Sequence, residues 1–339
     1  MWTVINRTPY AAEGGWVQDK DGHQIWLVAV KASFDLPPGR APRLAREQRP
    51  VLRMSEPRGE EGASSCRYES DLLGVKPGTD LLVEGSAWAR QGQLARHVDV
   101  AMRVGPVQKQ LRVFGDRSWR RSPIGTLQST PPEPFEALPI VFERAYGGWD
   151  RAASDPAQHR LEMRNPVGVG FFTDAAHAVG KALPNIEDPR HLIASWDDRP
   201  SPAGFTCVSC DWSPRRELAG SYDDEWQARR APLWAEDFDR RYYQCAPPDQ
   251  QIPGHLRGGE TVELHNLCAQ GSMEFSLPTV DLIFESRFGD DRVEHEARLA
   301  TVIIEPDLRR LTMTWQTSLL CDRRVDTLDY TSVSMRQNR

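Results

Sequence analysis

Two cysteines, Cys207 and Cys210, have two residues between them, which is the spacing found in many metal-binding and redox sites. Such a pair supplies half of a tetrahedral zinc site, and a second pair of ligands must supply the rest. The nearest candidates are His265 and Cys268, but their segment reads as a β-strand, in which residues three apart point to opposite faces. We therefore expect no metal ion and no other cofactor.

Other catalytic groupings are equally weak. No serine lies in a Gly-x-Ser-x-Gly turn, and no glycine-rich segment leads into the Lys-Ser/Thr pair of a phosphate-binding loop. Acidic residues do lie among aromatic residues at 223–225 and 236–239. Glycoside hydrolases use two carboxyl groups near aromatic rings that stack on sugars, so an all-β carbohydrate-active enzyme or lectin is the alternative function. Because arginines flank these acids, we expect paired or solvated charges and no enzyme.

The segment 212–251 has the most distinctive composition, with aromatic residues, arginines and acids interleaved. No apolar face repeats through it as in a core helix, and disordered linkers are poor in aromatic residues. Aromatic and arginine side chains carry much of the binding energy of protein interfaces. We expect a partner-binding surface formed by Trp212, Arg215, Tyr222, Trp226, Phe238 and Arg241. Arg215, Trp226 and Arg241 are expected to be exposed, whereas internal packing is an equal alternative for the other three.

The overall composition excludes several classes of protein. The 339 residues carry a formal net charge of -6, without the clustered basic excess of a nucleic-acid-binding protein. No apolar stretch approaches the length of a membrane span, and no basic segment followed by an apolar run marks a signal peptide. We expect a soluble, cytoplasmic protein with reduced cysteines, and neither nucleic acid nor a membrane as a partner.

β-strand patterns dominate both ends of the chain. Alternating apolar residues on both sides of Gly105 and Pro106 predict a hairpin. Further strands are predicted at 25–34, 81–88, 262–264, 280–288, 301–305 and 311–316. The sequence therefore predicts a mainly β fold, with sandwich-like or barrel-like units at 1–121 and 254–339. The two units are either separate or parts of one continuous domain.

The central region, 122–253, is expected to be rich in loops because prolines and glycines recur every few residues. Short helices are predicted at 174–179, 223–229 and 235–242, with Asp223 as the cap of the second. Several residues have the turn chemistry that fixes loop geometry: Gly147, Gly148, Asn165, Gly168, Gly170, Pro184 and Asn185. We expect these to shape the loops without contacting a partner.

A series of motifs in a fixed order resembles one known family. They include Lys76-Pro-Gly-Thr-Asp80, Gly115-Asp-Arg-Ser-Trp119, Phe142-Glu-Arg-Ala-Tyr-Gly-Gly148, Asn165-Pro-Val-Gly-Val-Gly-Phe171, Leu183-Pro-Asn-Ile-Glu-Asp-Pro189, Trp212-Ser-Pro-Arg215, Gly220-Ser-Tyr-Asp223 and Ala246-Pro-Pro-Asp-Gln-Gln251. Together they resemble the domain-of-unknown-function 2169 family over nearly the whole chain. Two mild departures are Ser221, where threonine is expected, and Val169, where a basic residue is expected.

The resemblance implies a role in bacterial type VI secretion. It implies a cytoplasmic adaptor or chaperone that holds a toxic effector, often one with a PAAR-type tip domain, and helps to load it onto the secretion spike. The expected partners are thus an effector and a spike or PAAR protein. The resemblance supplies no catalytic residue. A toxin-neutralising immunity protein is a third possibility.

Overall fold

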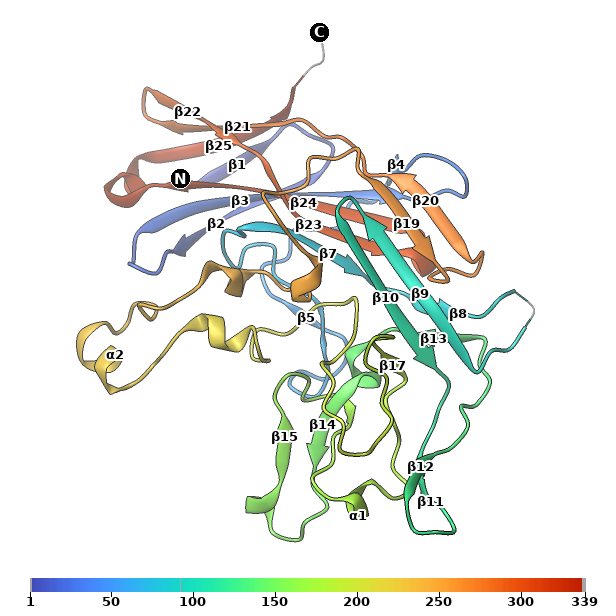
Figure 1. Ribbon diagram of the computed structural model, residues 1–339. Coiled ribbons are helices and arrows are strands. Elements are labelled where there is room, and N and C mark those ends of the chain that lie inside the picture. Colours follow the sequence, from blue (N-terminus) through green and yellow to red (C-terminus); the bar gives the residue numbers. More distant parts are fainter. Residues whose placement is uncertain (1, 92, 337–339) are drawn as a thin grey trace.

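The computed structural model describes residues 2–91 and 93–336, and strands dominate it, as the sequence predicts (Figure 1). Its α-helices within these ranges are short: α1 (Ala175–Ala178) and α2 (Asp224–Arg229). The short 3-10 helices are η1 (Phe142–Arg144), η2 (Pro156–Gln158), η3 (Arg216–Ala219), η4 (Arg240–Tyr243), η5 (Pro248–Gln250), η6 (Pro306–Leu308) and η7 (Asp322–Thr327). The prediction of a mainly β fold is confirmed.

The largest sheet is assembled from distant parts of the chain. Its order is β18 (Gln251–Pro253), β7 (Gly78–Val83), β23 (Arg298–Glu305), β24 (Arg310–Leu320), β3 (Gln24–Asp35) and β2 (Ala11–Gln18), with β4 (Arg43–Leu44) also on β3. Because β3 is buried on both faces, its sequence is a continuous apolar run rather than an alternation. One face joins the main core, and residues 45–76 cover the other through Val51, Leu72 and the buried Lys31–Asp71 ion pair.

Two further sheets pack against the same core. The five-stranded sheet has the order β17 (Ile186–Glu187), β10 (Val107–Phe114), β9 (His97–Val104), β19 (Thr261–His265) and β20 (Ser272–Ser276). The four-stranded sheet has the order β1 (Thr3–Asn6), β25 (Leu328–Met335), β21 (Leu282–Phe288) and β22 (Asp291–Glu296). The hairpin predicted around Gly105 is present as β9 and β10, with Gly105 at φ 52°. Strands from both ends of the chain pair within these sheets, so the two expected β units share one hydrophobic core.

Small strands and turns form the rest of the fold. The pairs are β5 (Glu56–Pro57) with β6 (Cys66–Tyr68), β8 (Ser86–Trp88) with β13 (Ala137–Pro139), and β11 (Trp119–Arg121) with β12 (Leu127–Ser129). A three-stranded sheet contains β15 (Arg160–Glu162), β14 (Tyr146–Asp150) and β16 (Val169–Gly170). Figure 1 shows β11, β12, β14, β15 and α1 together below the larger sheets.

Three of the four glycines expected to fix loop geometry, Gly147, Gly148 and Gly170, have positive φ angles. Gly147 and Gly148 in β14 have φ values of 151° and 93°. A Cβ on Gly148 would lie 2.2 Å from the carbonyl oxygen of Gly168, so a side chain has no room. Asn165 is fully buried, and its Nδ2 donates hydrogen bonds to two backbone carbonyls. Of the remaining predicted loop residues, Gly170 at φ 93° packs on Pro184, and Asn185 Nδ2 donates to a backbone carbonyl. That these residues make no partner contact stays a prediction.

Two of the three predicted central helices form as expected. Asp174 and Asp223 accept a backbone N–H at the starts of α1 and α2. The third prediction, at 235–242, is wrong, because a turn precedes the single 3-10 turn η4 there. The predicted strand at 81–88 is also divided into β7 and β8, since its chain leaves the large sheet at Glu84 and Gly85.

Candidate functional site

Residues 212–245, which we name the arm, leave the sheets and return with little regular structure. Figure 1 shows α2 at the outer end of this stretch, to one side of the large sheets. The arm contains all six residues that the sequence places in a partner-binding surface. Three of the six are buried, namely Trp212, Arg215 and Phe238. Tyr222 and Arg241 are exposed, whereas Trp226, which was expected to be exposed, is partly buried.

The base of the arm is anchored by Trp212 and Arg215. Trp212 is 3% exposed and packs edge-on against Phe142, with ring centroids 5.6 Å apart. The expectation that Arg215 is exposed is wrong, because the residue is 4% exposed and its Nη1 lies 2.6 Å from a Glu69 carboxylate oxygen. Its Nε also donates to the carbonyl of Tyr242 at 2.8 Å. Arg215 therefore ties the two ends of the arm to the body of the protein.

An aromatic cluster forms the middle of the arm. Phe238 is 8% exposed and lies beside Trp234, Tyr242 and Tyr243, with ring centroids 4.7 to 5.8 Å apart. Tyr243 packs so closely on Gly74 that a Cβ there would lie 2.4 Å from its ring. Packing inside the protein thus accounts for Phe238 as well as Trp212, and neither presents a free surface.

The outer end of the arm is accessible. Tyr222 is 47% exposed and meets the partly buried Trp226 edge-on, at 4.8 Å between centroids. Trp226 donates from its indole nitrogen to the carbonyl of Leu233 at 2.9 Å, which fixes its ring. Beside Trp226 is a hollow of about 460 Å³, lined by Ser221, Asp223, Glu225, Trp226, Arg229, Arg230, Glu236 and Asp237. Arg241 is exposed but lies outside this lining, paired with Asp239.

Most charged groups of the hollow also hold the arm together. Asp223 caps α2, and Asp237 accepts hydrogen bonds from the backbone N–H and hydroxyl of Ser221. The hydrogen bonds from Ser221 lower the pKa of Asp237, so this carboxylate stays charged at neutral pH. Glu225 pairs with Arg229 at 2.9 Å. These carboxylates are committed to structural contacts, which does not favour a pair of carboxyl groups dedicated to acid–base catalysis.

The turn between β2 and β3 holds the outer end in place. Arg230 donates to the carbonyl of Lys20 and pairs with Asp21 at 2.8 Å. Lys20 in turn donates from Nζ to the carbonyl of Glu236 at 3.1 Å. A distant hairpin therefore positions the hollow, and no local pattern in the arm could have predicted the role of Lys20 and Asp21.

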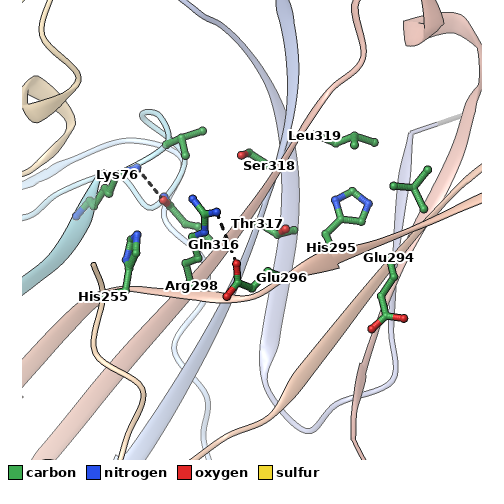
Figure 2. A pocket seen from close by; sticks show the side chains of 12 residues that line it. Lys76, His255, Glu294, His295, Glu296, Arg298, Gln316, Thr317, Ser318 and Leu319 are labelled. Carbon is green, nitrogen blue, oxygen red and sulfur yellow. Dashed lines mark hydrogen bonds and ion pairs between the residues drawn. The ribbon is translucent and has the colours of Figure 1, made fainter. Parts of the chain in front are cut away.

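A second hollow, of about 210 Å³, opens where β22 and β24 diverge, as Figure 2 shows. The chain passes from β22 into β23 through Ala297 and pairs with β24 only from Arg298 onward. Within the described strands, residues 317–320 of β24 pair with β3 on one side and have no strand on the other. This open edge borders the hollow, whose lining also includes His255 and His295. Burial lowers the pKa of both histidines.

The cysteine pair singled out by the sequence does not form a chelate with its expected partners. Cys207 is fully buried, whereas Cys210 is exposed, and neither joins His265 or Cys268 in any metal-type cluster of the described residues. Two other groups have suitable ligand atoms within 4.8 Å of one another: Cys66, Glu69 and Cys207; and Asp19, Asp21 and His23. In the second group, Asp19 already accepts from His23, and Asp21 is paired with Arg230.

Comparison with known proteins places the chain in a family. Residues 21–316 match the sequence model of the family described as "Uncharacterized protein conserved in bacteria (DUF2169)". No curated protein and no solved structure matches the chain. Among the described residues, no helix has the length and apolar character needed to cross a membrane. Because the match covers most of the chain, this protein belongs to the DUF2169 family of uncharacterized bacterial proteins.

Proposed function

We propose that this chain is a non-catalytic cytoplasmic adaptor that binds a type VI secretion effector and helps to load it onto the secretion spike. The effector would be one with a PAAR-type tip domain. The observation that carries the proposal is the outer end of the arm, where an aromatic pair borders a charged hollow. Aromatic anchors with a polar rim are typical of protein-binding surfaces.

The charges of this hollow indicate the kind of segment that it would bind. Four carboxylates and two guanidinium groups line it, so the excess is negative. A basic segment of the effector with an apolar side chain to place against Trp226 would complement both features. The buried base, with Arg215 bound to Glu69, would hold this surface rigid before the partner arrives.

Co-purification from the native host tests the proposal. The tagged chain should retain an effector or spike protein encoded by a neighbouring gene, identified by mass spectrometry. Purified chain and effector should then form a complex on gel filtration. If the neighbouring effector is secreted normally by a strain that lacks this chain, and the two proteins do not bind each other, the adaptor function is wrong.

The alternative, a carbohydrate-active enzyme or lectin, makes a different prediction. Trp226 beside carboxylates could stack on a sugar ring, and a sugar that binds there would raise the melting temperature in proportion to its concentration. The structural hydrogen bonds of Asp223 and Asp237 favour the adaptor. A sugar-dependent thermal shift that Trp226→Ala abolishes would favour the alternative.

A further inference from the structure

Three cysteines from distant parts of the chain meet beneath the arm. Cys66 begins β6, Cys207 lies shortly before the arm, and Cys245 is the last residue of the arm. Cys207 and Cys245 are fully buried, and Cys66 is 8% exposed. The backbone fixes their approach, because Val208 N–H donates to the carbonyl of Cys245 at 2.8 Å. Figure 1 shows why the sequence alone does not predict this meeting: β5, next to β6, lies beside the arm but is far from it in the chain.

The ligand atoms of this cluster suit a soft divalent metal. The sulfur atoms of Cys66 and Cys207 and a carboxylate oxygen of Glu69 lie within 4.8 Å of one another. The thiol of Cys207 also interacts with the thiol of Cys245, which adds a third sulfur. Thiolates that share one zinc ion at ~2.3 Å lie a little under ~4 Å apart. A contraction of about 1 Å or less would therefore bring the sulfur atoms of Cys66 and Cys207 and the oxygen of Glu69 into a zinc-type geometry.

The buried charges around the cluster balance one another, so a divalent cation with two thiolates can bind there without an excess charge. Arg215 pairs with Glu69 at 2.6 Å, and Lys76 pairs with Asp80 at 2.6 Å, so these buried charges cancel. A divalent ion bound by the thiolates of two cysteines adds no net charge. Burial of an uncompensated charge is costly, so neutrality is a condition that any such site must meet.

An independent observation points to an anion at the cluster. Arg215 is 4% exposed, yet its Nη2 is a buried donor without a hydrogen-bond acceptor among the described residues. Its guanidinium group interacts electrostatically with both Cys207 and Cys245. The sulfur of a cysteine that binds no metal offers only a weak acceptor. A metal ion deprotonates the thiols that it binds, and the resulting thiolates would supply the acceptor that Nη2 lacks.

We propose that Cys66, Cys207 and Glu69 form a binding site for one zinc-type divalent cation. The metal would link β6 to the segment that precedes the arm and thereby fix the base of the arm. The proposal does not depend on the adaptor function. It runs against the expectation from the sequence that no metal is bound, and it does not use Cys210, which is exposed whereas Cys207 is buried.

Metal content and cobalt absorption test the proposal. Untagged protein from zinc-supplemented medium should contain about one zinc per chain, and refolding it with Co²⁺ should give thiolate-to-cobalt charge-transfer absorption. Cys207→Ser should lose both signals. The controls Cys210→Ser, an exposed neighbour in sequence, and Cys321→Ser, a buried thiol elsewhere, should keep them. A chelator should lower the melting temperature of the parent protein but not that of Cys207→Ser.

Three results would overturn the proposal. The first is a parent protein with less than about a tenth of an equivalent of zinc and no cobalt–thiolate absorption. The second is full absorption in Cys207→Ser. The third is its loss in Cys210→Ser, which would assign the metal to a surface chelate. If Cys207→Ser does not fold, Cys66→Ala with Glu69→Gln as a second variant gives the same decision, because each removes one ligand and leaves Cys207 in place.

Discussion

Replacing Asp71 with alanine should destabilise the protein far more than replacing an exposed acid. Asp71 lies in the segment that covers the outer face of the large sheet, and its Oδ2 is 2.7 Å from the Nζ of Lys31 in β3. Both side chains are buried, at 6% and 3% exposure. The carboxylate also accepts hydrogen bonds from the backbone N–H of Leu52 and the hydroxyl of Thr314. One side chain thus satisfies three buried donors.

The size of the effect follows from what the substitution leaves behind. Asp71→Ala leaves the ammonium group of Lys31 buried without a counter-charge, and breaking a buried pair in this way costs about 3–5 kcal/mol. Asp71→Asn keeps an acceptor of similar shape and removes only the charge, so its cost should be smaller. Glu225→Ala is the matched control, because the Glu225–Arg229 pair is exposed and such pairs contribute about 1 kcal/mol or less.

Urea unfolding followed by tryptophan fluorescence measures all three variants. The expected order of lost stability is Asp71→Ala first, Asp71→Asn second and Glu225→Ala last. Equal midpoints for Asp71→Ala and Glu225→Ala would refute the reasoning. That result would mean that residues 45–76 are not held on the sheet by buried charge.

Three further outcomes follow from other parts of the structure. Gly148→Val should lower the free energy of unfolding by at least ~1–3 kcal/mol, because it adds a steric clash to a positive φ. Gly125→Ala is the control and should cost less, because Gly125 also has a positive φ of 88° but lies in open space. Equal melting temperatures for the two variants would contradict this. Burial lowers the pKa of His295, so the unfolded chain binds a proton more readily below about pH 6.5. The contribution of His295 to stability is complete above that pH and is lost as the pH drops through the lower folded pKa. His295→Gln should therefore make the melting temperature less dependent on pH between pH 7 and 5. A variant whose melting temperature changes with pH as steeply as that of the parent would contradict this. Arg215→Ala should lower the melting temperature as strongly as Asp71→Ala, and a shift no larger than that of Arg241→Ala would contradict the anchoring role of Arg215.

The strands were predictable because their patterns are local. Period-two alternation identified β9 and β10, and a continuous apolar run identified β3, which is buried on both faces. How the strands combine was not predictable, since β7 pairs in parallel with β23, more than 200 residues later in the sequence. Sequence periodicity carries no information about such a partner.

The composition of the sequence singled out the arm, but not the arrangement of its residues. Arg215 was expected on the surface because arginine side chains usually lie there. Its burial depends on Glu69, which no local pattern connects to it. The proximity of Cys66 and Cys207 was not predictable for the same reason, because no local pattern connects residues so far apart in the chain. Cys207 and Cys210 are close in the sequence, but Cys207 is buried and Cys210 is exposed.

The most direct test of the proposed adaptor function is the affinity of the purified chain for the effector encoded beside it. Trp226→Ala should weaken binding by about 30-fold, which corresponds to ~2 kcal/mol at an aromatic hot spot, while the protein remains folded. Trp149→Ala is the matched control, because Trp149 is 45% exposed and lies outside the arm, and its affinity should equal that of the parent. If Trp226→Ala binds the effector as tightly as the parent does, the outer end of the arm is not the binding surface, and the account is contradicted.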